Sequence, residues 1–255
     1  MRVLISGCSF THWPEFPGGP NICWPKYLQN LNPNWTIKNI AEPAAGNQYI
    51  ADSVVRAVMQ ETFDHVLVMW SGVSRLDFLT SLEDPYWERL FDSYGFYRRV
   101  DQCPNKLGWI FSGGQVGTWY QNDIAKSVFS KMYKISNPLS LASINLMEMI
   151  KTQNFLQNKK IPYHFMSYVN YWNTDEFVSR NGDFGVLKYP ELELLIREID
   201  FTRWIFINNN RDGVYEVSKD RNSFQPDGFH PGNDVSEFWA DIVNQHVQKY
   251  LQSLG

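Results

Sequence analysis

Two short motifs near opposite ends of the chain carry side chains suited to nucleophilic chemistry. Gly7-Cys8-Ser9 directly follows a short apolar run, so a serine hydroxyl stands at the end of a predicted strand. Asp227 and His230 are separated by only two residues, one of them the glycine that lets the chain fold back. A carboxylate that orients an imidazole, and an imidazole that takes a serine proton, form the relay of acyl-transfer chemistry. The pattern predicts Ser9 as nucleophile, His230 as base and Asp227 as the orienting acid.

Each motif also has a purely structural interpretation. Ser9 is a residue type that caps helices, and Gly7 would then only permit a turn. Asp227 and His230 would bond only to the backbone of an exposed loop. The position of this second motif favours the chemical interpretation, because it precedes Asn233-Asp234-x-x-Glu237, a capping-box type of helix start.

Three segments, taken in order along the chain, resemble the sequence blocks of the SGNH hydrolase superfamily. The first block, usually Gly-Asp-Ser, is similar to Gly7-Cys8-Ser9; the second is similar to Gly46-Asn47; and the last, Asp-x-x-His-Pro, matches residues 227–231 without change. The resemblance implies esterase activity without a metal or organic cofactor. It also implies a three-layer α/β fold and a place for the Gly46 N–H in the oxyanion hole.

The third block departs from the family pattern. Where the family usually has Gly-x-Asn-Asp, this chain has residues 72–75, Gly-Val-Ser-Arg. Ser74 takes the slot of the asparagine that donates to the oxyanion, so we expect an oxyanion hole formed by Ser9, Gly46, Ser74 and Asn47. A missing donor costs about 10²–10³ in rate, which predicts slow hydrolysis of generic esters.

Two further residues are candidates for substrate binding. Arg75 follows the central strand, where a guanidinium can bind a carboxylate, sulfate or phosphate; the alternative is a structural ion pair with Asp77. His12 lies three residues beyond Ser9 and could contact substrate. The alternative is that it only packs within an aromatic loop. We interpret His65 and His164, in or beside predicted strands, as structural.

The elements that must position these residues alternate between strand and helix. Asp64 to Trp70 is apolar on both faces, as in a central parallel strand covered by helices on each side. Strands followed by helices predict a mainly parallel, doubly wound sheet, with ligands bound beyond the carboxyl ends of its strands. The predicted strands are 2–6, 35–40, 64–70, 161–169 and 203–207, and the predicted helices are 47–62, 139–157 and 234–251.

We expect one domain over residues 1–255, with residues 75–138 as an aromatic-rich insertion over the cleft. We expect this insertion to form one wall or a lid of the cleft, with Trp87, Trp109 or Trp119 near it. Aromatic residues make up 16% of the chain, which fits either stacking surfaces for a sugar or an aromatic core.

Composition limits the partners and the location. The net charge is −4 without a long basic run, so nucleic acid is not an expected partner. No apolar run reaches the ~20 residues that span a bilayer, and the N-terminus lacks a signal-peptide core, so we expect a cytoplasmic protein without a membrane partner. Three cysteines at irregular spacing do not predict a metal site.

Together these features predict a serine hydrolase acting on small-molecule or carbohydrate esters, with acetyl groups on a carbohydrate as candidate substrates. Two alternatives remain. One is a binding or structural module that keeps the fold and has lost efficient turnover, which the altered third block favours. The other is an acyltransferase that uses the same serine. The oligomeric state is left open.

Overall fold

The computed structural model describes residues 1–12, 23–81, 83, 97–100, 106–114, 123–176, 178–179, 182–209 and 211–253.

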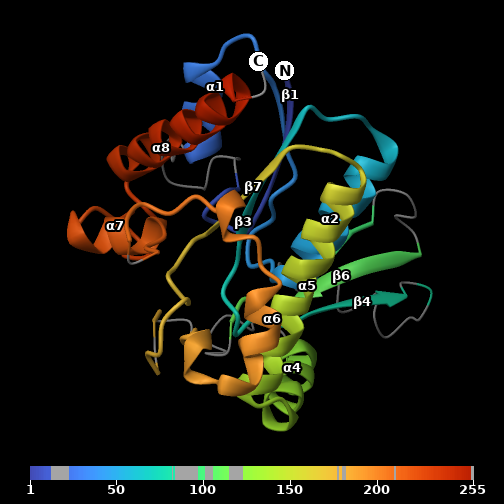
Figure 1. Cartoon of the computed structure of the whole chain (residues 1–255). Helices are drawn as coiled ribbons and strands as arrows, with labels where there is room; N and C mark the ends of the chain where they lie inside the picture. The colour runs from blue at the N-terminus through green and yellow to red at the C-terminus, as the bar shows by residue number, and fades with distance from the viewer. Residues whose placement is uncertain are drawn as a thin grey trace.

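The core of the molecule is a parallel sheet of four strands. Its strand order is β2 (Thr36–Asn39), β1 (Arg2–Ser6), β3 (His65–Trp70) and β7 (Tyr163–Ser167). All six residues of β3 are buried, as its unbroken apolar pattern predicts for a strand covered on both faces. Figure 1 shows the strands running side by side through the middle of the molecule.

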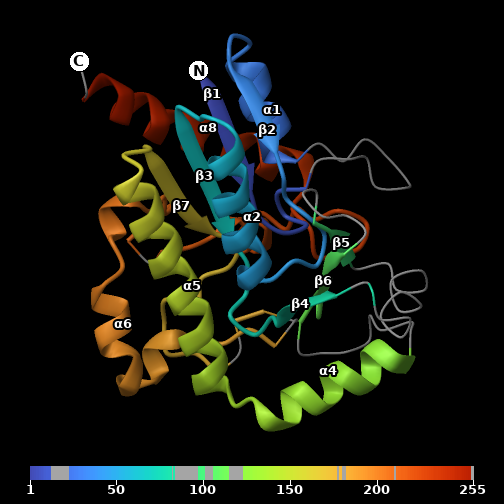
Figure 2. The same cartoon turned by 90° about the vertical axis from the view of Figure 1, so that its right-hand side faces the viewer.

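Helices cover both faces of this sheet. Helices α1 (Trp24–Leu31) and α8 (Asn233–Gln252) pack together on one face, and α2 (Asn47–Gln60) and α5 (Pro138–Asn158) pack together on the other (Figure 2). Helix α2 turns an apolar stripe toward the sheet because Ile50, Val54 and Ala57 recur at helical spacing and are buried. The predicted fold class, a three-layer α/β arrangement with a mainly parallel sheet, is confirmed.

One predicted strand does not form. The run from Arg203 to Ile207 begins in a short 3₁₀ helix and makes only a single bridge to the main sheet, between Trp204 and Phe165. Beyond this bridge the Ile207 N–H bonds to the carbonyl of Asp212 at 3.5 Å, within a turn and not within the sheet. The other short elements are η1 (Val186–Lys188), η2 (Pro190–Leu192), α6 (Glu193–Arg197), η3 (Phe201–Arg203) and α7 (Val214–Asp220).

The predicted insertion contains a second, antiparallel sheet. Its order is β4 (Asp77–Ser81), β6 (Leu107–Phe111) and β5 (Tyr97–Arg99), and helix α4 (Asp123–Ile135) follows it. Figure 2 shows this sheet and α4 beyond the carboxyl ends of the main strands. Trp109 of β6 packs edge-on against Tyr49 of α2. Trp87 and Trp119 lie outside the described residues, so the predicted lid stays a prediction.

The aromatic residues of the described chain belong mainly to the core. Six of its seven tryptophans are buried, which favours the aromatic-core interpretation over exposed stacking surfaces for sugar. These are Trp24, Trp70, Trp109, Trp172, Trp204 and Trp239. Among the described helices, none combines the length and apolar character that a membrane span requires.

Two buried histidines connect neighbouring strands of the main sheet. His65 of β3 and His164 of β7 stack with ring centroids 5.0 Å apart, and their Nε2 and Nδ1 atoms share a hydrogen bond of 2.9 Å. Burial, reinforced by neighbouring positive charge, lowers the pKa of His65 to about 3 and that of His164 to about 4. Both are therefore neutral in the folded protein near neutral pH, in keeping with a structural role.

This pair predicts a loss of stability in acid. Between about pH 4 and 6.5 the unfolded chain protonates both histidines while the folded chain does not, so the free energy of unfolding must fall as the pH drops. Because other groups titrate in the same range, we compare the wild type with His164→Gln. The variant should lose less stability between pH 6.5 and 4.5, by up to about 1.4 kcal/mol per pH unit. Urea denaturation at each pH measures this, and parallel profiles for the two proteins would contradict it.

Candidate active site

Ser9 lies on a tight turn at the carboxyl end of β1. After Ser6 the chain forms one helical turn, in which the carbonyl of Cys8 accepts the N–H groups of Thr11 (2.9 Å) and His12 (3.0 Å). Gly7 is needed at the start of this turn, because a Cβ there would stand 2.5 Å from the hydroxyl oxygen of Thr11. The turn places the serine at the edge of the sheet where parallel α/β proteins bind ligands.

The loop before α8 presents Asp227 and His230. Gly228 has a φ of 66°, a left-handed conformation that glycine adopts without strain. The loop folds back on itself, so one oxygen of Asp227 accepts the backbone N–H groups of Phe229 (2.8 Å) and His230 (3.0 Å). The carboxylate is thereby held by its own loop.

The three predicted catalytic residues lie together. His230 Nε2 is 2.8 Å from Ser9 Oγ, and His230 Nδ1 is hydrogen-bonded to the second carboxylate oxygen of Asp227. Ser9 is 8% exposed, and the side chain of His230 is 21% exposed, so the pair is sheltered but open to a small molecule. This is the order of contacts that a serine nucleophile, a general base and an orienting carboxylate require.

The surroundings keep Asp227 ionised. Partial burial opposes ionisation, but the hydrogen bonds from the His230 imidazole and from the Phe229 and His230 backbone outweigh it. They hold the pKa of Asp227 well below its usual range. An ionised carboxylate at this position stabilises the imidazolium that forms when His230 takes a proton.

Two aromatic rings pack against the imidazole of His230. The ring of Phe10 lies 5.0 Å from that of His230, and the ring of Phe229 lies 5.3 Å away. Tyr168, which follows β7, packs against Phe10 with centroids 4.5 Å apart. These contacts limit the rotation of His230 and preserve its alignment with Ser9.

The predicted oxyanion donors at the start of α2 have other hydrogen-bond partners in the structure. The Gly46 N–H donates to the buried carboxylate of Asp77 at 3.0 Å. The side-chain amide of Asn47 bonds to both backbone groups of Ser71, at 3.2 Å and 2.7 Å. Burial raises the pKa of Asp77 to about 7 despite the N–H groups of Gly46 and Tyr49, which favour its ionised form.

Ser74 is also committed to a buried partner. Its hydroxyl donates to Asp183 at 2.6 Å, and its N–H is 3.2 Å from the same oxygen. The other oxygen of Asp183 accepts the hydroxyls of Tyr168 and Ser179. A hydroxyl has one hydrogen, so in this conformation Ser74 directs its hydrogen to Asp183 rather than to an oxyanion. The backbone N–H of Ser9, in contrast, has no hydrogen-bond partner among the described residues.

Arg75 lies in the interior, only 2% exposed. Its Nη1 donates to the carbonyl of Ala45 at 2.9 Å, and its guanidinium lies 5.6 Å from the ring centre of Tyr168. Its Nε has no partner among the described residues. Arg75 thus fixes the loop before Gly46 in the structure, and its predicted role as an anion clamp stays a prediction.

His12 stands beside the catalytic turn. Its Nδ1 donates to the carbonyl of Ala41 at 2.7 Å, which assigns the proton of the neutral ring to Nδ1. Burial lowers the pKa of His12, and the positive charge of Arg98 adds to this effect, although the bond to Ala41 opposes it. His12 lines a pocket, described below, but contact with substrate stays a prediction.

The described residues contain no cluster of three or more histidine, cysteine, aspartate or glutamate side chains placed to hold a metal ion.

No family model matches the chain, and no curated protein is similar to it in sequence. Among solved structures it is similar to a psychrotrophic esterase, EstA, from a Pseudoalteromonas species, with 11% identity, 98% of each chain covered and a TM-score of 0.48. It is also similar to a member of the lipolytic G-D-S-L family from Veillonella parvula, with 10% identity, 96% of each chain covered and a TM-score of 0.43.

A third similar structure is a catalytic mutant of Axe2, an acetylxylan esterase from Geobacillus stearothermophilus. Its identity is 12%, the match covers 96% of this chain and 92% of that one, and the TM-score is 0.45. In this chain the serine turn follows β1 and the Asp-x-x-His loop precedes the last helix, as the sequence blocks predict.

Sequence reasoning missed several residues that support this site. Asp183 comes from an irregular stretch without a motif, and Tyr168 and Phe10 were not singled out. The one local signal for Asp183 is Gly72, because a Cβ at position 72 would stand 1.9 Å from the Asp183 carboxylate. Such a close approach explains a glycine after the central strand but does not reveal its partner.

Proposed function

We propose that this protein is a serine esterase in which Ser9 attacks the acyl carbon of an ester. The observation that supports this best is the continuous relay from Ser9 Oγ through His230 to Asp227. As the Oγ–C bond forms, the hydroxyl proton passes to His230 Nε2. The tetrahedral intermediate then breaks its bond to the leaving alcohol, which takes that proton from Nε2.

Water completes the cycle by the same route. It attacks the acyl carbon of the acyl-enzyme while His230 Nε2 takes one of its protons. The carboxylic acid then leaves as Ser9 Oγ regains the proton. Asp227 keeps Nδ1 protonated throughout, so that Nε2 is the atom that accepts and returns the proton.

Covalent labelling with a fluorophosphonate tests the nucleophile. The probe phosphonylates an activated serine with loss of fluoride, whereas an ordinary capping serine reacts negligibly. We expect peptide mapping to find the label on Ser9 and the labelling rate to fall in His230→Ala. An unlabelled folded protein, or a label on a different serine, would rule out the proposed nucleophile.

A second candidate function is a binding module with little turnover. It is favoured by the hydrogen bonds that direct Gly46, Asn47 and Ser74 away from an oxyanion. In that case Ser9 would accept the fluorophosphonate, but a panel of small esters would be turned over no faster than about 10³-fold above the buffer rate. Turnover well above that level would instead support the esterase and indicate that a further donor joins the Ser9 N–H.

The substrate panel follows from the expected chemistry. We propose acetyl esters of carbohydrates as its first members and include small aliphatic esters and thioesters for comparison. An acyltransferase differs in preferring an alcohol or sugar acceptor to water, so product analysis with and without added acceptor distinguishes transfer from hydrolysis.

A further inference from the structure

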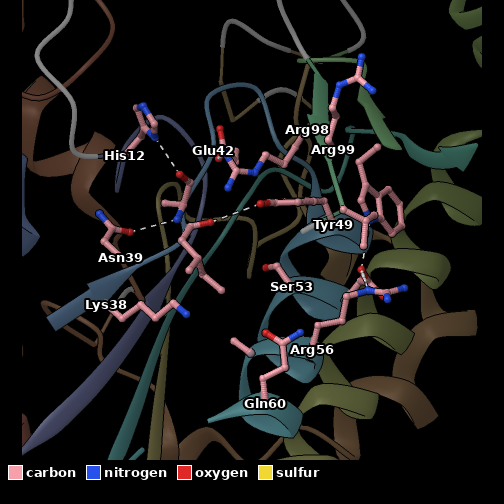
Figure 3. Close-up of a pocket in the computed structure, with 16 residues that line it drawn as sticks. His12, Lys38, Asn39, Glu42, Tyr49, Ser53, Arg56, Gln60, Arg98 and Arg99 are labelled. Carbon is pink, nitrogen blue, oxygen red and sulfur yellow. Dashed lines mark hydrogen bonds and ion pairs between the residues drawn. The ribbon is translucent and has the colours of Figure 1, made fainter. Parts of the chain in front are cut away.

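A pocket of about 370 Å³ lies beside the catalytic turn and is not part of the Ser9 relay (Figure 3). Helix α2 forms one wall, the end of β2 and the loop after it form a second, and β5 with Trp109 of β6 forms a third. The volume lies within the range of small-molecule binding sites.

The charged lining of this pocket differs in sign from the chain as a whole. Four basic residues face two acidic ones, a net charge of +2 with histidine neutral, whereas the chain carries −4. They are Lys38, Arg56, Arg98, Arg99, Glu42 and Asp52. Three of the basic side chains are paired with carboxylates: Lys38 with Glu61, Arg56 with Asp52 and Arg98 with Glu42. A concave surface of one sign concentrates ions of the other.

The guanidinium of Arg56 is held in place by its neighbours. Its Nε lies 2.6 Å from one carboxylate oxygen of Asp52, and the indole N–H of Trp109 donates to the same oxygen at 3.1 Å. A guanidinium offers five N–H donors in a planar fork that suits an anion. Asp52 therefore orients Arg56 in advance of any ligand.

Arg98 extends toward Glu42, on the side of the pocket that faces His12, whereas Arg99 lies on the opposite side (Figure 3). Arg98 Nη1 is 3.2 Å from a carboxylate oxygen of Glu42. Arginines from two separate elements, α2 and β5, thus border the same space. Such an arrangement suits bidentate recognition of a planar carboxylate or of a phosphate.

We propose that this pocket binds a small polar molecule that carries a carboxylate or phosphate group. The anion contacts the guanidinium groups of Arg56 and Arg98. Neutral polar side chains farther along the pocket, Ser53 and Gln60, face the uncharged part of the ligand. This site is independent of the proposed esterase chemistry, because none of the three relay residues lines it.

The site nevertheless borders the catalytic turn. The His12 N–H bonds to the carbonyl of Cys8 at 3.0 Å, and the Glu42 N–H bonds to the carbonyl of Gly7 at 3.2 Å. His12 and Glu42 both line the pocket, so a ligand there lies against the backbone that positions Ser9.

An NMR titration of the full chain labelled with ¹⁵N-arginine tests the proposal. The probes are inorganic phosphate, D-glucuronate and D-glucose, and Arg→Gln variants assign the Nε–H signals. We expect at least one of the two anions to shift the Arg56 and Arg98 signals saturably, and glucose to leave them unchanged. Comparing phosphate with glucuronate tells which acidic group the pocket prefers. The affinity should weaken at high salt, since the attraction is electrostatic.

Arg98→Gln and Arg197→Gln form a matched pair of variants. Each arginine is exposed and forms an ion pair with a glutamate, Glu42 for Arg98 and Glu193 for Arg197, but of the two only Arg98 lines the pocket. We expect the affinity for the anion to fall about tenfold or more in Arg98→Gln, as for the loss of a charged hydrogen bond. Arg197→Gln should bind the anion as tightly as the wild type does. Unfolding curves for both variants check that each is folded.

Several results would overturn the assignment. They are the absence of saturable shifts with either anion, equal shifts with glucose, and unchanged affinity in Arg98→Gln. Equal weakening in Arg197→Gln would likewise show that the anions respond to overall charge and not to this pocket.

Discussion

Replacing Ser9 with alanine should abolish ester hydrolysis while leaving the fold intact. In an efficient serine enzyme, loss of the nucleophile costs about 10⁶ in kcat, and we expect a loss of at least about 10³ here. The side chain is small, and among the described residues its hydroxyl is hydrogen-bonded only to His230 Nε2, so the melting temperature should move by only a few degrees. Initial rates on the best ester of the panel, together with thermal unfolding, measure both effects.

Ser253→Ala is the control for this substitution. Ser253 is exposed just after α8, and its hydroxyl donates to the backbone carbonyl of Tyr250. It should retain wild-type rates. If Ser9→Ala kept a rate close to that of the wild type, hydrolysis would have to proceed without a Ser9 acyl-enzyme, and the proposed mechanism would fail.

Asp227→Asn should reduce kcat by about 10⁴, the cost of the equivalent change in a serine protease. The amide can donate to His230 Nδ1, which favours the tautomer with its proton on Nε2. That nitrogen can then no longer accept the proton of Ser9. The amide also lacks the charge that stabilises the imidazolium. The KM should change little, because Asp227 accepts hydrogen bonds from its own loop and from His230 on the side away from Ser9.

Asp220→Asn provides the matched control, an exposed aspartate at the end of α7 that undergoes the same chemical change. Its kinetics should equal those of the wild type. Near wild-type turnover in Asp227→Asn would mean that His230 does not need a carboxylate, and the site would then have to be reinterpreted as a Ser-His pair.

Local patterns predicted the main sheet well. The strands β1, β2, β3 and β7 lie within the predicted ranges. β1 and β3 are short apolar runs, and turn residues follow each of them. The insertion was harder to predict. Its strands pair across gaps of many residues, and strand pairing depends on the partner at least as much as on local propensity. Helix α1 was missed as well, although Trp24 and Leu28 form a buried stripe at helical spacing.

The catalytic relay was predictable because its parts are local. Ser9 follows a recognisable strand, and Asp227 and His230 share one turn, so each fragment could be recognised separately. Parallel strands then bring both fragments to the same edge of the sheet, since their carboxyl ends point the same way. The fold class and the proposed nucleophile, base and acid follow from the sequence by itself.

Only the tertiary structure decided where the buried polar groups point. Ser74 and Asp183 are 109 residues apart, and Gly46 and Asp77 are 31 apart, so no local pattern shows that these donors are already engaged. The arginine-lined pocket likewise combines α2 with the distant strand β5. Hydrogen bonds to a buried carboxylate depend on which groups the fold brings within about 3 Å, and that distance is set by packing rather than by sequence spacing.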